Sequence, residues 1–277
     1  MKEVSGTMLI TLYARAKETV SRNPLINDPA AVQMISVIMP EIKDSDNPIH
    51  KKILKDSFSK KLAVTMSLRS RQFDRYTADF MQRNPSGTVI NLGCGLDTRF
   101  DRIDNGTIKW FDIDLPEVIE LRRRFLRENQ RRKFIAASVL EKEWLNEVRT
   151  GGPYLVLAEG LFMYLTEDGV KALLRNILTD LGPAELVCEV TNSYWVSKMQ
   201  SRYMQKKFRK KLGMTGSATF TFGIPSGEHF ETWSRDYHFL GEWTYFDEKE
   251  KKLGWFNLFS SFSILRKVQW TLRYRLG

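Results

Sequence analysis

The fold is decided by the stretch Val89-Ile90-Asn91-Leu92-Gly93-Cys94-Gly95 of a 277-residue chain. Its first part is a β-branched, apolar run, 88–92, which predicts a buried strand. Gly93 and Gly95 follow directly, and glycine there permits a tight turn and lets backbone N–H groups approach a ligand without a Cβ clash. A purely steric strand-to-helix turn uses the same glycines, so both interpretations stay open for this pair.

Short apolar runs alternate with helical patterns on the carboxyl side of this turn. Strands are predicted at 88–92, 108–113, 133–136, 154–158 and 185–190, and helices at 116–129 and 167–179. Thr166 is the predicted N-cap of the last helix. Strands that alternate with helices predict an α/β fold, with a mostly parallel sheet, right-handed crossovers and helices on both faces.

The chain divides by pattern into four parts. We expect a helical cap at 1–85, an α/β core at 86–190, a lid or substrate insertion at 191–235 and a C-terminal completion of the sheet at 236–277. The insertion combines a helix-like stretch at about 193–212 with a glycine-containing loop, and strand-like alternation returns at 237–246 and 268–274. We expect the insertion over the carboxyl ends of the strands, where such sheets bind ligands.

Two carboxylates end the second predicted strand, about twenty residues beyond the glycines. A carboxylate at this distance can accept both hydroxyls of a ribose. Thr98 stands where a dinucleotide fingerprint has its third glycine, so a nucleoside without a pyrophosphate fits better than NAD or FAD. Asp114 is the preferred ribose ligand and is also a candidate N-cap, in a capping box with Glu117. Asp112 is the second candidate, facing either solvent or the sheet.

Composition and charge set the broad class. Hydrophobic residues make up 42% of the chain, which predicts a large folded core, and the net charge is +10. Basic runs at 122–124, 131–133 and 206–211 are interpreted as solvated faces, with anion-binding faces as the alternative. No apolar run reaches the roughly 20 residues of a membrane span, and we expect a cytoplasmic protein without a membrane partner. Cys94 and Cys188 lie in separate apolar segments, so neither a disulfide nor a metal site is expected.

Three runs, at 89–99, 110–116 and 158–165, resemble the leucine carboxyl methyltransferase family, and more closely its bacterial branch of tetracenomycin-type polyketide O-methyltransferases. Further matches lie at 12–16, 27–29, 68–71 and 241–243. The resemblance implies a class I methyltransferase, with a Rossmann-like sheet and S-adenosyl-L-methionine as cofactor. It also implies methyl transfer to a carboxylate or hydroxyl of a small, polyketide-like molecule.

The resemblance assigns cofactor contacts residue by residue. Arg69 would pair with the methionine carboxylate, a task that suits a planar guanidinium, and Arg71 is its rival. Gly93 and Gly95 would lie against the cofactor, and Asp114 would bind its ribose.

The resemblance also assigns contacts to the adenine and to the amino group of the cofactor. Ser138 and Val139 stand where family members often have Asp-Leu against the adenine, and a serine hydroxyl would bind the exocyclic amine without charge assistance. Glu159 matches an acidic residue near the cofactor's amino group. Its alternative role is a carboxylate satisfied by backbone N–H groups at a strand end.

The sequence leaves the catalytic residues unknown. A methyl sulfonium is already activated, so the enzyme mainly positions the nucleophile. A carboxylate acceptor needs no base, whereas a phenol, with a reference pKa of about 10, benefits from one. His229, His238 and Tyr194 are base candidates that are equally explained as structural residues.

The aromatic side chains of the insertion, together with one methionine, fit either an acceptor pocket or ordinary core. The candidates are Trp195, Met199, Phe220, Phe222 and the run 230–233.

Two rival functions are compatible with parts of the sequence. The basic charge suggests a nucleic-acid methyltransferase, but 159–162 reads Glu-Gly-Leu-Phe and lacks the Asp/Asn-Pro-Pro-Tyr/Phe signature of that class. A non-catalytic scaffold that binds S-adenosylmethionine is the other rival. The sequence favours no particular oligomeric state.

Overall fold

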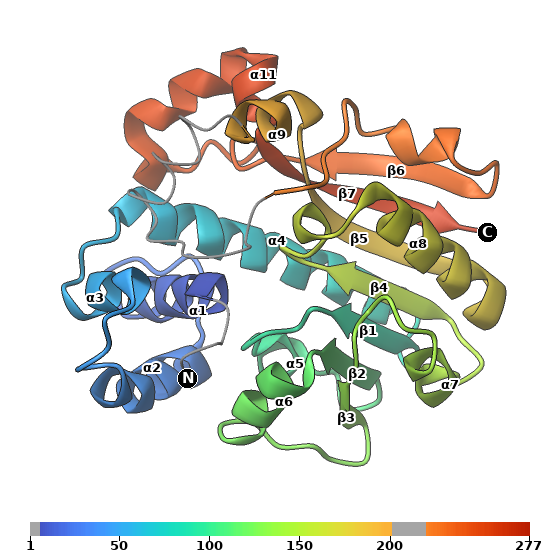
Figure 1. Cartoon of the computed structure of the whole chain (residues 1–277), viewed down its shortest axis with the longest axis horizontal. Coiled ribbons are helices and arrows are strands. Elements are labelled where there is room, and N and C mark those ends of the chain that lie inside the picture. The colour runs from blue at the N-terminus through green and yellow to red at the C-terminus, as the bar shows by residue number, and fades with distance from the viewer. Residues whose placement is uncertain (1–5, 201–219) are drawn as a thin grey trace.

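The computed structural model describes residues 6–200 and 220–277 as a layered α/β fold (Figure 1). The strands are β1 Thr88–Leu92, β2 Lys109–Asp114, β3 Arg132–Ala136, β4 Tyr154–Ala158, β5 Ala184–Thr191, β6 Tyr237–Trp243 and β7 Gln269–Leu276. They form one sheet in the order β3-β2-β1-β4-β5-β7-β6. Strands β1 to β5 are mutually parallel, and β7 pairs antiparallel with both β5 and β6. The predicted α/β class and mostly parallel sheet are confirmed.

Helices surround this sheet and extend beyond it. Their bounds are α1 Gly6–Thr19, α2 Pro29–Glu41, α3 Pro48–Leu54, α4 Lys60–Arg83, α5 Arg99–Ile103, α6 Pro116–Arg123, α7 Trp144–Val148, α8 Glu167–Leu181, α9 Ser193–Met199 and α11 Ser263–Arg266, with 3-10 turns η1 Phe162–Tyr164, η2 His229–Thr232 and η3 Lys251–Ser261. Thr166 caps α8 as predicted, because its side chain accepts the N–H of Gly169. Within the described part of the chain, no helix is long and apolar enough to cross a membrane.

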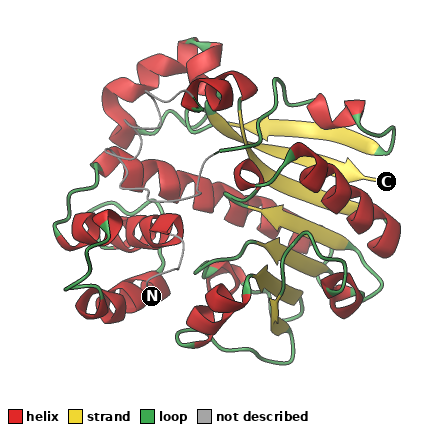
Figure 2. Ribbon diagram, in the orientation of Figure 1, coloured by secondary structure: helices red, strands yellow, loops and turns green. Residues whose placement is uncertain are grey.

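The strand sequences explain the two layers of helices in Figure 2. Successive side chains of a strand point to opposite faces. Val89 and Leu155 therefore pack with Phe73 of α4 on one face. Ile90 and Val156 pack on the other face, in the larger cluster that includes α7 and α8. Continuous apolar runs such as these are typical of strands buried on both faces.

Helices α1 to α3 lie together beside the amino-terminal half of α4 (Figure 1). Apolar side chains of α1 and α2 form a core cluster with Cys94 and Leu96, the residues on either side of Gly95. The N-terminal helices thus pack directly on the turn that follows β1. They position one wall of the site described below.

The predicted helix at 116–129 is too long, because α6 ends at Arg123. The carboxamide oxygen of Asn129 accepts the backbone N–H groups of Arg131 and Arg132 at 2.8 Å each. These bonds hold a turn that starts β3. An asparagine side chain that caps its own following backbone in this way competes with helix formation.

The segment predicted as an insertion is described only at its two ends. At its start, α9 Ser193–Met199 covers the first part of the predicted helix, whose remainder from 201 lies outside the described residues. At its end, Ile224 forms a parallel bridge with Asn192. Phe222 and Phe230 are buried in the large cluster beside α8. The end of the predicted insertion, from 222 to 230, therefore contributes to the core.

Candidate functional site

A cavity of about 500 Å³ opens where the carboxyl ends of β1, β2 and β4 meet. This is the edge at which parallel α/β sheets bind ligands, and the volume lies within the range of small-molecule sites. Five of the seven predicted cofactor residues line it: Arg69, Gly93, Gly95, Asp114 and Glu159. Ser138 and Val139 follow β3 and are not among its lining residues.

The glycine turn is held open by its backbone conformation. Gly93 has φ 62° and Gly95 has φ 48°, in the left-handed region that favours glycine. A Cβ on Gly93 would lie 2.9 Å from Cδ1 of Leu161, and one on Gly95 would lie 3.0 Å from Cγ of Met8. Both neighbours line the cavity, so a side chain at either position would strain the backbone and displace a wall.

Asp114, the last residue of β2, is fixed by this same turn. Its Oδ2 accepts the N–H of Gly95 at 2.7 Å and its Oδ1 accepts the N–H of Leu115 at 2.8 Å. Burial raises the pKa of Asp114, against the lowering effect of these two N–H donors. Each oxygen keeps further acceptor capacity for a hydroxyl. The predicted capping box is wrong, because Leu115 is the N-cap residue of α6 and the Asp114 carboxylate binds the strand-end backbone instead.

Asp112 is excluded as the ribose ligand by its own partners. The side chain is fully buried. Its Oδ1 accepts from Asn91 Nδ2 and Trp110 Nε1, and its Oδ2 accepts from Arg122 Nη2 and Arg132 Nε. Arg122 and Arg132 are therefore buried, and the prediction that their basic runs form solvated faces is wrong at these two positions. A shared buried carboxylate offsets the cost of removing two guanidinium groups from water.

Arg69 of α4 reaches across to two strands. Its Nε donates to Glu159 Oε1 and its Nη1 to Glu189 Oε2, both at 2.8 Å. The rival Arg71 instead pairs with Glu248 and does not line the cavity. Glu159 has side-chain donors as partners, including Ser70 Oγ at 3.3 Å, so the alternative of a carboxylate satisfied by backbone N–H groups is wrong.

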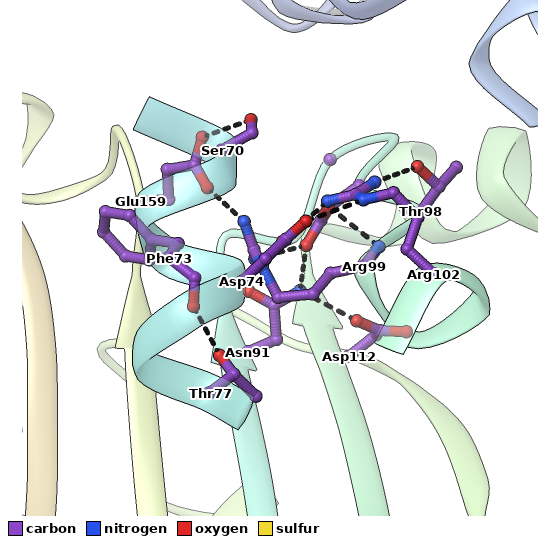
Figure 3. Close-up of polar contacts among 12 residues, drawn as sticks. Ser70, Phe73, Asp74, Thr77, Asn91, Thr98, Arg99, Arg102, Asp112 and Glu159 are labelled. Carbon is purple, nitrogen blue, oxygen red and sulfur yellow. Dashed lines mark hydrogen bonds and ion pairs between the residues drawn. The ribbon is translucent and has the colours of Figure 1, made fainter. Parts of the chain in front are cut away.

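Arg99 is a site residue that sequence reasoning missed. Its buried guanidinium donates to Asp74 Oδ1 at 2.7 Å, to Asp97 Oδ2 at 2.6 Å and to Glu159 Oε2 at 2.6 Å (Figure 3). Burial would raise the pKa of Glu159, but Arg69 and Arg99 hold it below its usual value. The signal was present in the Gly-Leu-Asp-Thr-Arg run at 95–99, which ends on Arg99.

A second branch of ion pairs joins the N-terminal helices to this centre. Arg102 donates to Asp28 Oδ2 at 3.0 Å and to Asp74 Oδ1 at 2.9 Å. Arg15 donates to the same Asp28 oxygen at 2.8 Å and to the carbonyl oxygen of Leu96 at 2.7 Å. Figure 3 shows Arg102 and Asp74 next to Arg99. The helices of the cap and the glycine turn are therefore locked in one geometry.

The connected network contains more carboxyl groups than guanidinium groups. It contains four guanidinium groups and five carboxylates, those of Arg15, Arg69, Arg99, Arg102, Asp28, Asp74, Asp97, Glu159 and Glu189. Asp97, Asp114 and Glu159 line the cavity itself. Their field favours a ligand with a net positive charge.

The base candidates lie away from the cavity. His229, His238 and Tyr194 are not among its lining residues. The ring of His229 packs edge-on against Trp233, 5.5 Å between centroids, and Tyr194 is exposed. Tyr164 does line the cavity, and burial raises the pKa of its hydroxyl.

Met199 and the aromatic residues of the 191–235 segment divide between the two interpretations. Met199 and Phe220 line the cavity. Phe222 and Phe230 are core residues, with Trp233 packed against them. Trp195 donates its indole N–H to the carbonyl oxygen of Ile264 at 2.8 Å. The basic run at 206–211 lies outside the described residues.

Comparison with known proteins identifies the family. The leucine carboxyl methyltransferase model matches residues 8–178. The tetracenomycin polyketide synthesis O-methyltransferase TcmP of Streptomyces glaucescens is 31% identical over 245 residues, which cover 88% of this chain and 84% of that protein. The S-adenosyl-L-methionine-dependent methyltransferase dpfgK of Gibberella zeae is 36% identical over 181 residues, 62% of this chain and 59% of that protein. The chain therefore belongs to the leucine carboxyl methyltransferase family and is an S-adenosylmethionine-dependent methyltransferase with the Rossmann-like class I fold.

Proposed function

We propose that this enzyme transfers a methyl group to a carboxylate or hydroxyl oxygen of a small, polyketide-like molecule. The observation that carries the proposal is the Asp114 carboxylate, fixed by the N–H groups of Gly95 and Leu115 at the edge of a cavity of about 500 Å³. A small molecule, rather than a nucleic acid, fits a cavity of that size.

The lining residues fit S-adenosylmethionine in charge and shape. The cofactor carries a sulfonium and an ammonium group against one carboxylate, and the surrounding network has an excess of carboxylates. Asp114 would accept the ribose hydroxyls through its remaining lone pairs. Gly93 and Gly95 would leave room for the cofactor against the bare backbone of the turn.

The methionine end of the cofactor is assigned to Arg69 and Glu159. Glu159, ionised between Arg69 and Arg99, would accept the ammonium group. Arg69 bonds its carboxylate partners through Nε and Nη1, and we assign its Nη2 to the methionine carboxylate. Ser138 and Val139 remain the proposed adenine contacts.

The protein's task in the reaction is positional. Bound S-adenosylmethionine supplies an activated methyl group. The buried walls of the cavity exclude water and hold the acceptor oxygen in line with that methyl group, and such orientation can lower a barrier by about 7–11 kcal/mol. We propose a cytoplasmic location, which suits two free, buried cysteines, Cys94 and Cys188.

Two experiments test this function. Calorimetry of the purified protein with S-adenosylmethionine and S-adenosylhomocysteine should show binding of both at micromolar concentration, and failure of both at high micromolar concentration would contradict the assignment. A methyl-transfer assay with labelled cofactor, followed by treatment of the product with alkali, then distinguishes a carboxylate acceptor from a hydroxyl acceptor. A methyl ester releases labelled methanol in alkali, and an aryl ether does not.

A further inference from the structure

We propose that the end of the cavity between α4 and the β5–β7 pair binds the methyl acceptor, an apolar, ring-bearing molecule that Thr191 and Gln269 orient by hydrogen bonds to a neutral oxygen. This proposal rests on the proposed function and deepens it, because it names the acceptor site and the chemistry that the site recognises. Neither residue was singled out by sequence reasoning.

The sheet places Thr191 and Gln269 side by side. They are register partners at the last rung of the β5–β7 ladder, and both line the cavity. Thr191 lies two residues beyond Glu189, so the two side chains point to the same face of the sheet. Glu189 meets Arg69 of α4 on that face. The side chain of Thr191 therefore lies on the face of the sheet that α4 covers.

The Thr191 hydroxyl is an unused hydrogen-bonding group. Thr191 is 1% exposed, and its Oγ1 finds no partner among the residues that the structure describes. A buried hydroxyl without a partner costs stability, and such groups in native proteins call for an explanation. A ligand oxygen bound at this end of the cavity would supply the missing partner. The carboxamide of Gln269 adds two N–H donors beside it.

The surrounding wall is apolar and presents aromatic rings. Met66 of α4 and Met199 of α9 line it, and methionine side chains adapt to irregular ligands. Tyr164 and Phe220 meet edge to face, with 5.5 Å between ring centroids, and both line the cavity. Their arrangement leaves aromatic surface for another ring system.

The donors that orient the acceptor are uncharged. Along the described lining, the cationic side chains are those of Arg15 and Arg69, and each is bound to carboxylates. Thr191 and Gln269 would therefore recognise the orienting oxygen through neutral hydrogen bonds, as suits a carbonyl or hydroxyl of a ring system. This orienting oxygen is distinct from the oxygen that receives the methyl group.

The test compares two fluorescent probes of similar size on protein saturated with S-adenosylhomocysteine. 2-Acetylnaphthalene carries a neutral accepting oxygen, and 2-ethylnaphthalene lacks it. The measured quantity is the ratio of their dissociation constants in wild type, Thr191→Val, Thr191→Ser and Gln269→Leu. The valine and leucine variants should each reduce the preference for the ketone about three- to tenfold, the loss of one neutral hydrogen bond. The Thr191→Ser variant keeps the hydroxyl and should therefore keep the wild-type preference for the ketone.

Three outcomes overturn the proposal. The first is an unchanged ratio in Thr191→Val, and the second is a wild-type protein that binds S-adenosylhomocysteine but neither naphthalene. The third is a lower melting temperature of ligand-free Thr191→Val, because removal of a hydroxyl without a partner should leave stability equal or higher. Failure of wild type to bind S-adenosylhomocysteine would instead refute the proposed function.

Discussion

The carboxylate of Asp114 accepts the backbone N–H of Gly95 at 2.7 Å, across nineteen residues of sequence. This bond joins the end of β2 to the turn after β1, and so fixes the acidic group against the glycine backbone. The pairing of β1 with β2 makes it possible, since Leu92, the last residue of β1, is the register partner of Ile113, which directly precedes Asp114. The carboxylate that we propose as the ribose ligand and the glycine turn thus form one unit.

Replacement of Asp114 by asparagine should weaken cofactor binding while the fold persists. The amide keeps the shape, but its NH2 group replaces one acceptor oxygen, so one of the two backbone bonds is lost together with the charge-assisted acceptance of the ribose hydroxyls. The dissociation constant of S-adenosylmethionine should therefore rise about 10- to 100-fold by calorimetry. Asp104→Asn is the matched control, because Asp104 pairs with Arg131 at the surface. Equal affinities of the two variants would exclude Asp114 from the ribose site.

Cofactor affinity should fall as the pH is lowered. Burial raises the pKa of Asp114 above the reference value of about 3.9, so its carboxylate takes up a proton at less acidic pH than a surface aspartate. The protonated group is a poorer acceptor for ribose hydroxyls. A raised carboxyl pKa favours the folded state as pH falls, so Asp114 should not lower apo-protein stability in this window.

The pH experiment combines calorimetry with thermal melting. Between pH 7 and pH 4.5, the wild-type affinity should decline before the apo-protein melting temperature does, and Asp114→Asn should show a flatter affinity profile. If the affinities of wild type and Asp114→Asn change with pH in parallel, then protonation of Asp114 is not what weakens cofactor binding.

Gly93→Ala should lose both stability and cofactor affinity. Alanine at φ 62° costs about 1–2 kcal/mol, and its Cβ would also meet the Leu161 side chain at 2.9 Å. Gly106→Ala is a close control, since Gly106 has φ 82° and open space around its Cβ. Denaturant unfolding should show a backbone cost in both variants, and only Gly93→Ala should weaken S-adenosylhomocysteine binding.

Arg99→Met should destabilise the protein by about 3–5 kcal/mol, because it removes the cation that the largely buried carboxylates of Asp74, Asp97 and Glu159 share. Arg83→Met is the comparison, because Arg83 pairs with Glu185 at the surface. That exposed pair should be worth less than about 1 kcal/mol. Urea unfolding measures both, and similar losses would show that the Arg99 network contributes no more than a surface ion pair.

Local pattern was sufficient for the central part of the fold. The apolar runs at 88–92 and 154–158 became β1 and β4 with the predicted bounds. A strand buried on both faces needs apolar side chains at every position, and that requirement is written in consecutive residues. The helix predicted at 116–129 was too long: α6 ends at Arg123, and Asn129 instead holds the turn that leads into β3.

The sequence by itself determined the parallel sheet, the glycine turn and the acidic residue that follows the next strand, since each depends on neighbours along the chain. Only the tertiary structure decided which charged groups are buried together, as in the bond from Arg99 to Glu159 across sixty residues. It also placed Thr191 beside Gln269 in the cavity wall. Ion pairs and cavity walls form between residues that folding brings into contact, and periodicity along the chain carries no record of those contacts.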